Sequence, residues 1–125
     1  MASRSLKDLT PAMQLKAEAF IEACDTAGID VLIYCTLRTG AEQDDLYKIG
    51  RTIPGKIVTN ARAGQSLHNT GQAFDFVPMI HGKPQWGDSV LYARCGIIGE
   101  GIGMEWAGRW TGKLRETAHM QYKGT

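Results

Sequence analysis

Residues 66–80 read SLHNTGQAFDFVPMI, a polar turn that runs into an alternating strand. In the strand, Ala73 and Asp75 fall on one face and the phenylalanines beside them on the other, as a two-residue period requires. Gly71 allows the chain to turn tightly before the strand. His68 and Asp75 lie seven positions apart across this turn. The stretch is therefore either half of a metal site or an ordinary loop with a buried aspartate.

The residues before this stretch predict a helix, a strand and a second helix. Thr10 suits an N-cap and Pro11 a first helical position, and Gly28 can end that helix. The apolar, β-branched run at 29–36, IDVLIYCT, predicts a central strand. A capping box that begins at Thr39 then opens a short helix over about two turns.

Residues 51–67 show no periodicity and predict a long irregular loop, which in a compact domain is usually functional or disordered. After the strand at 71–80, a third helix begins at Asp88 or Ser89 and is expected to break at the glycines that follow position 98. The remaining strand candidates are MEWAGRW and HMQYK. This order predicts an α+β fold, with helices packed on a mostly antiparallel sheet.

Length and composition predict one domain over residues 1–125. The chain has 14 basic and 13 acidic residues without a basic stripe, which argues against nucleic acid as a partner. No apolar run reaches transmembrane length and no signal peptide is present, so we expect synthesis in the cytoplasm and no stable membrane insertion. Three cysteines without a CxxC pair argue against a disulfide framework and a thiolate zinc site.

The scarce histidines suggest a metal constellation. His119 follows Glu116 by three positions, so the two side chains stay close. Two histidines, His68 and His119, with Asp75 would make a three-ligand zinc site of the catalytic type. Glu116 could then act as the base, because a carboxylate near the attacking water can take its proton. The alternative for Glu116 is a surface salt bridge with Arg115.

The pattern Ser66-x-His68-x-x-Gly71-x-Ala73-x-Asp75, with Glu116-x-x-His119, resembles the zinc peptidases of the D-alanyl-D-alanine carboxypeptidase and L-alanyl-D-glutamate endopeptidase family. That family includes phage endolysins and vancomycin-resistance dipeptidases and shares its fold with the Hedgehog signalling domain. The resemblance covers most of the chain and includes LRTGAEQDDLY at 37–47.

The resemblance implies a role for each matching residue. His68, Asp75 and His119 match the zinc ligands, and Glu116 matches the catalytic carboxylate, where endolysins often have aspartate. Arg38 matches the arginine that binds substrate and stabilises the oxyanion; the alternative is a solvated charge that bonds to nearby carboxylates of the second helix. Ser66 matches a serine that supports a ligand or contacts substrate.

The expected function is a Zn²⁺ metallopeptidase that cleaves the stem peptide of bacterial peptidoglycan as an L-alanyl-D-glutamate endopeptidase. A phage lysin of this kind would wait in the cytoplasm as a monomer until a holin opens the inner membrane. With six residues after His119, we expect no separate wall-binding domain, as is typical of lysins for thin Gram-negative walls. The alternatives are a D,D-carboxypeptidase or D-Ala-D-Ala dipeptidase, a non-catalytic zinc-binding module, and a tail-associated phage protein.

Several other polar and aromatic residues have expected positions. His81 is expected at the surface in a turn, and Trp86 and Trp106 are expected in the core or at its edge. Gln43 could reach the site from the second helix. Gln121, two residues past His119 on a strand, would share its face and could bond to it.

Overall fold

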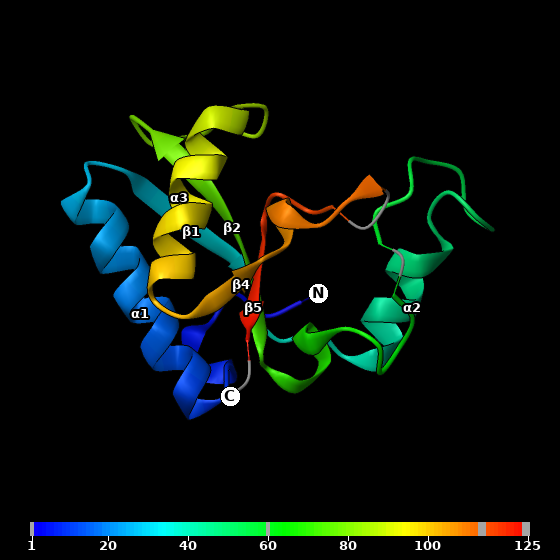
Figure 1. Cartoon of the computed structure of the whole chain (residues 1–125). Helices are drawn as coiled ribbons and strands as arrows, with labels where there is room; N and C mark the ends of the chain where they lie inside the picture. Colours follow the sequence, from blue (N-terminus) through cyan, green and yellow to red (C-terminus); the bar gives the residue numbers. More distant parts are fainter. Residues whose placement is uncertain (1, 60, 113–114, 124–125) are drawn as a thin grey trace.

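A computed structural model describes residues 2–59, 61–112 and 115–123 (Figure 1). The α-helices are α1 (Pro11–Thr26), α2 (Gly40–Lys48) and α3 (Ser89–Gly101). Short 3-10 helices are η1 (Leu6–Asp8), η2 (Leu67–Thr70) and η3 (Ala107–Arg109). The strands are β1 (Asp30–Cys35), β2 (Ala73–Ile80), β3 (Lys83–Pro84), β4 (Met104–Trp106) and β5 (His119–Tyr122). The predicted α+β fold is confirmed, with β3 and the 3-10 helices as additions.

The strands of the described ranges form one antiparallel sheet of five, in the order β1–β2–β5–β4, with β3 paired to the far end of β2. The central strand is therefore β2, and the prediction of a central strand at 29–36 is wrong. The apolar run of β1 serves one face only. Ile33 faces the core and is buried, whereas Leu32 on the other face is 40% exposed, and a register shift before Cys35 turns that residue to the face of Asp75.

The main core lies between the sheet and two helices, α1 and α3, which pack against each other (Figure 1). Phe20 of α1 contacts Phe74 and Phe76 of β2, with ring centroids 5.4 and 5.1 Å apart. Because successive strand residues point to opposite faces, Asp75 between these phenylalanines points away from that core. The functional side chains therefore gather on the sheet face that α1 and α3 leave open.

The predicted helix starts are confirmed. The hydroxyl of Thr10 accepts a hydrogen bond from Met13 N at 3.2 Å, and Pro11 is the first helical residue. The capping box of Thr39 and Glu42 is present at the start of α2.

The predicted break of the third helix at the glycines after position 98 is confirmed, because α3 ends at Gly101, whereas Gly99 lies inside the helix. A methyl group at Gly99 would lie 2.3 Å from Cε of Met120. The glycine therefore serves close packing of the helix on β5.

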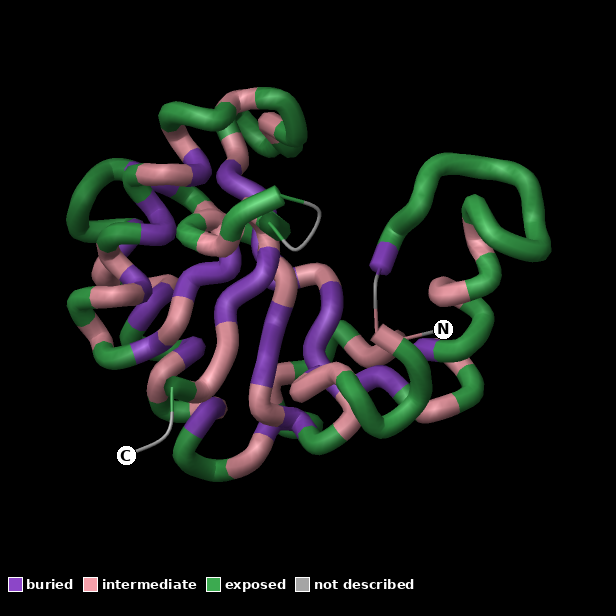
Figure 2. Tube along the Cα trace, turned by 45° about the vertical axis from the view of Figure 1, so that its right-hand side comes forward, coloured by how far each residue is buried: buried purple, intermediate pink, exposed green. Residues whose placement is uncertain are grey.

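The second helix, α2, stands on the other side of the sheet (Figure 1), and its one buried side chain is the polar Gln43. Residues 50–58 after it are exposed along their length (Figure 2). Apart from a bridge between Ile49 and Ile53, the described part of 51–66 has no strand or helix, which agrees with the predicted irregular loop. The loop ends where η2 begins at Leu67.

The burial of one histidine and two tryptophans tests the expected surface and core positions. His81 is exposed, as predicted, and Trp106 is buried at 5% exposure. The prediction for Trp86 is wrong, because its side chain is 57% exposed. Trp86 instead packs edge-on against the ring of Tyr34, with ring centroids 5.2 Å apart.

Candidate metal centre and active site

The turn before β2 positions His68. The hydroxyl of Ser66 accepts a hydrogen bond from His68 N at 3.2 Å and caps η2. Gly71 ends η2 with a φ of 71°, and a Cβ there would lie 2.8 Å from the carbonyl oxygen of Asp8. Only glycine combines this left-handed conformation with so close a contact. The turn therefore folds His68 back toward Asp75 on the next strand.

The His68 ring is held from both sides. Its Nδ1 lies 2.9 Å from the carbonyl oxygen of Thr36, and its Nε2 lies 3.0 Å from Oδ1 of Asp75. A carbonyl oxygen can only accept, so Nδ1 carries the proton that it donates to Thr36. Nε2 is then the nitrogen that faces Asp75, and it donates to that carboxylate while the ring is charged.

His119 reaches the same oxygen from β5, where it pairs with Asp75 in register. Its Nδ1 lies 3.4 Å from Oδ1 of Asp75, and its Nε2 lies 2.8 Å from Oε1 of Gln121. Gln121 in turn donates through Nε2 to Oε2 of Glu105 at 3.2 Å, which fixes the orientation of its amide. Nε2 of His119 must therefore donate, and Nδ1 is left to face Asp75. The predicted bond from Gln121 to His119 is confirmed.

Three candidate ligand atoms thus meet around Asp75, because Nε2 of His68 lies 3.0 Å and Nδ1 of His119 lies 3.4 Å from its Oδ1. Burial disfavours charge on His68, but its hydrogen bond with Asp75 outweighs burial and raises the pKa of His68 to about 10. Burial opposes charge on Asp75 too, yet hydrogen bonds from His119 and His68 hold the pKa of Asp75 well below its usual range. The buried Asp75 carboxylate is therefore stabilised by a positive charge beside it. Two imidazoles and one carboxylate suit a catalytic Zn²⁺ site.

Cys35 is a buried free thiol at the edge of this centre, and the sequence prediction treated it as a small hydrophobic residue. With His68 and Asp75, its Sγ makes a group of candidate ligand atoms that all lie within 4.8 Å of one another, and His119 is not part of that group. A thiol therefore lies among the candidate ligands, although the cysteine pattern in the sequence argues against a thiolate zinc site. However, Sγ lies 3.8 Å from Nδ1 of His68, the nitrogen that donates to Thr36. The hydrogen-bond pattern therefore favours His119 over Cys35 as the third ligand.

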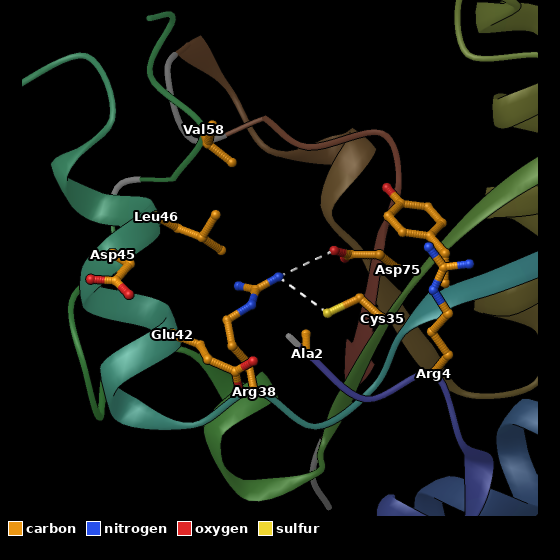
Figure 3. Close-up of a pocket in the computed structure, with 10 residues that line it drawn as sticks. Ala2, Arg4, Cys35, Arg38, Glu42, Asp45, Leu46, Val58 and Asp75 are labelled. Carbon is orange, nitrogen blue, oxygen red and sulfur yellow. Dashed lines mark hydrogen bonds and ion pairs between the residues drawn. The ribbon is translucent and has the colours of Figure 1, made fainter. Parts of the chain in front are cut away.

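Arg38 follows β1 and is buried beside the centre (Figure 3). Its guanidinium donates to Oε1 of Gln43 at 2.8 Å and to Sγ of Cys35 at 3.2 Å, and it lies 3.6 Å from Oδ2 of Asp75. The solvated alternative for Arg38 is therefore wrong. Its Nε has no hydrogen-bond partner among the described residues. A buried donor without a partner suits a group that binds substrate.

Gln43 connects this arginine to the irregular loop, so the suggestion that it reaches the site is confirmed. Besides accepting from Arg38, its amide donates to the hydroxyl of Thr59 at 3.2 Å and to the carbonyl of Ala61 at 2.7 Å. The distance of 16 to 18 residues between these partners explains why no local motif indicated the network.

Glu116 lies on the rim of the centre. It lines a cavity of about 380 Å³ together with Arg38, Ser66, His68 and His119. Its carboxylate forms no hydrogen bond or ion pair with a described residue, whereas Arg115 donates to the carbonyl of Gly108. The surface salt bridge is therefore not formed. Partial burial raises the pKa of Glu116, against the lowering effect of His119, which suits a group that exchanges a proton.

Comparison with known proteins identifies the family. Residues 6–95 match the model of VanY, D-alanyl-D-alanine carboxypeptidase. The chain belongs to the VanY family. This VanY-family chain is 36% identical over 129 residues to the peptidoglycan L-alanyl-D-glutamate endopeptidase CwlK of Bacillus subtilis (strain 168), covering 91% of this chain and 73% of CwlK. It is 32% identical over 130 residues to the L-alanyl-D-glutamate peptidase of Listeria phage A118, covering 98% of this chain but 42% of that protein.

Solved structures share the fold. The L-Ala D-Glu endopeptidase ChiX of Serratia marcescens superposes with a TM-score of 0.72 at 22% identity, over 98% of this chain and 88% of ChiX. A vancomycin-resistance D,D-pentapeptidase VanY in complex with Zn(II) gives a TM-score of 0.68 at 17% identity, over 93% of this chain and 73% of that chain. At these identities the likeness supports the fold assignment.

Proposed function

We propose that this VanY-family chain is a zinc metallopeptidase that hydrolyses the L-alanyl-D-glutamate bond in the stem peptide of peptidoglycan. The observation that carries the proposal is the convergence of Nε2 of His68, Oδ1 of Asp75 and Nδ1 of His119, with the opposite nitrogen of each ring bonded to an acceptor. The two relatives from Bacillus subtilis and Listeria phage A118 are both named for hydrolysis of this bond.

His68, Asp75 and His119 would hold the zinc ion. When bound, Zn²⁺ polarises a carbonyl oxygen and makes a water molecule acidic near neutral pH. The hydrogen bonds from His68 to Thr36 and from His119 to Gln121 fix both rings in the orientation that presents the ligand nitrogens.

Glu116 would act as the base. Its carboxylate takes a proton from the water that attacks the amide carbon, and the same oxygen then gives that proton to the leaving nitrogen as the C–N bond breaks. Its raised pKa favours this return step, because a stronger conjugate base holds the proton until the amine departs.

Arg38 would hold the substrate carbonyl. Its side chain lines the cavities beside the centre, and a positive donor placed in advance stabilises the oxygen that gains negative charge. Gln43 keeps the guanidinium in place from the α2 side. Ser66 would support His68 through its bond to the backbone of η2.

Residues 1–125 would work as one peptidase domain, as a monomer with the stem peptide as its partner and without nucleic acid. None of the described helices has the length and apolarity needed to cross a membrane. We further propose that the chain is a phage endolysin, made in the host cytoplasm and admitted to the cell wall through a holin-type opening. The similarity to the Listeria phage peptidase supports this part of the proposal.

Digestion of purified peptidoglycan, followed by mass spectrometry of the fragments, tests the function. Cleavage between L-alanine and D-glutamate, lost with EDTA, is the expected result. Release of free D-alanine would instead indicate the D,D-carboxypeptidase or dipeptidase alternative. Glu116→Gln is expected to retain one zinc per chain and lose at least about 100-fold in kcat. Full lysis by that variant would contradict the proposed mechanism.

A further inference from the structure

A second cavity, of about 470 Å³, opens beside the metal centre (Figure 3). One wall is α2, with Asp45 and Leu46, and the opposite wall is the N-terminal segment, with Arg4 (Figure 3). Arg38 and Asp75 line the cavity between these walls. The cavity therefore leads from the proposed reaction centre toward Arg4.

The segment that carries Arg4 is fixed although it lies close to the chain end. Ser3 N donates to the carbonyl of Leu37 at 2.9 Å, and Thr36 N donates back to the carbonyl of Ser3 at 2.7 Å. The hydroxyl of Thr36 also donates to the carbonyl of Ser5 at 2.9 Å. These bonds attach the segment to the chain just after β1, so the backbone of Arg4 has a defined place on the cavity wall.

The guanidinium of Arg4 is free to bind an anionic ligand. Its side chain is exposed and forms no hydrogen bond or ion pair with any residue of the described ranges. Arg38, the other arginine that lines this cavity, differs because Gln43, Cys35 and Asp75 already bind its guanidinium. A guanidinium presents a planar fork of donors that matches a carboxylate in two hydrogen bonds. Arg4 is therefore suited to an anionic group that enters this cavity.

The stem peptide supplies such a group on one side of the scissile bond only. On the acyl side, the lactyl carboxyl and L-alanine are both consumed in amide bonds. On the amine side, D-glutamate continues through its γ-carboxyl group and keeps a free α-carboxylate, and the following diamino acid can carry another. An arginine on the cavity wall can thus determine which side of the substrate lies there.

We propose that Arg4 binds a free carboxylate on the amine side of the cleaved bond and so selects stem peptides that are not amidated. This inference rests on the proposed endopeptidase function. It assigns the cavity between α2 and the N-terminal segment to the leaving portion of the substrate.

The test compares zinc-loaded wild type with Arg4→Gln on three muropeptides: one unmodified, one with the D-glutamate α-carboxylate amidated, and one with the diamino acid carboxylate amidated. The wild type is expected to prefer the unmodified substrate about 10- to 30-fold in kcat/KM over one amidated form, with most of the change in KM. The amidated substrate that is cleaved with the lower kcat/KM identifies the carboxylate that Arg4 binds. In Arg4→Gln the preference is expected to disappear, while kcat on the amidated substrate stays within about twofold.

Arg4→Lys is expected to restore part of the preference, because lysine keeps the charge but not the fork. Arg94→Gln, at an exposed position on α3, is the matched control for loss of one surface arginine. Equal rates on all three substrates, or a preference that survives in Arg4→Gln, would overturn the inference. Failure of the wild type to cleave the L-Ala–D-Glu bond in every substrate would instead overturn the proposed function.

Discussion

Single hydrogen bonds decide which nitrogen of each histidine faces Asp75. His68 donates to a backbone carbonyl and His119 to a glutamine whose own amide is oriented by Glu105. These bonds fix the rings before any ligand arrives. The metal centre is thus shaped by residues whose importance only the folded chain makes visible.

The two possible ligand sets predict different variants to lose zinc. Since Cys35 lies by the nitrogen of His68 that donates to Thr36, we expect Cys35→Ser to retain one zinc per chain. His119→Ala, which removes the nitrogen facing Asp75, is expected to lose zinc and activity together. Elemental analysis of the purified proteins measures both. Loss of zinc from Cys35→Ser with retention in His119→Ala would place the thiol in the coordination shell.

At the scale of secondary-structure elements, glycine sets the distance between α3 and the sheet. A Cβ at Gly96 would lie 2.2 Å from the buried indole of Trp106. We expect Gly96→Ala to lower the free energy of unfolding by about 2 kcal/mol, despite the better helix propensity of alanine. Gly101→Ala is the control, because no atom lies within 4 Å of its added methyl group. Equal stability of the two variants in urea would contradict this account.

The end of α3 is also joined to η3 by an ion pair. Arg109 donates twice to the carboxylate of Glu100, at 2.9 Å each, and this bonding lowers the pKa of Glu100. Because the folded pKa lies below the unfolded one, the pair stabilises the fold above the unfolded pKa, and the effect is lost as pH falls through the folded value. Glu100→Gln is expected to lower the free energy of unfolding by about 0.5 kcal/mol at pH 7. Denaturant titrations should show no difference between the proteins near pH 2; a constant difference at both pH values would exclude the ion pair as its source.

For the whole molecule, the sheet with α1 and α3 contains the apolar core, whereas α2 and the exposed loop after it depend on polar bonds through Gln43 (Figures 1 and 2). Local stability follows buried apolar contacts, so we expect amides of α2 to exchange with deuterium faster than those of α1 and β2. Hydrogen exchange with mass spectrometry measures this order. Equal protection of α2 and α1 would show that the two sides unfold as one unit.

The sequence predicted those parts of the fold that depend on neighbouring residues. The caps at Thr10 and Thr39 and the alternation around Asp75 are local, and the structure confirms them. The same holds for the turn at Gly71, since positive φ favours glycine.

Predictions failed where distant contacts decide the outcome. Gly99 lies inside the helix where Met120 packs against it, and β1 is an edge strand because β2 is the one described strand that pairs with it. The sequence placed His68, Asp75 and His119 as one constellation through the family resemblance. It could not show that Cys35 would join them or that Gln43 would bond to Thr59 and Ala61, because these contacts arise from tertiary packing.

The attachment of Ala2–Ser5 to the residues after β1 has a practical consequence for handling the protein. An affinity tag or fusion partner joined at the amino terminus would emerge at the mouth of the cavity that Arg4 lines (Figure 3). Such an addition could shield the opening and lower measured turnover without any fault in the metal centre. Assays are therefore best made with the amino terminus unmodified and any tag placed after β5.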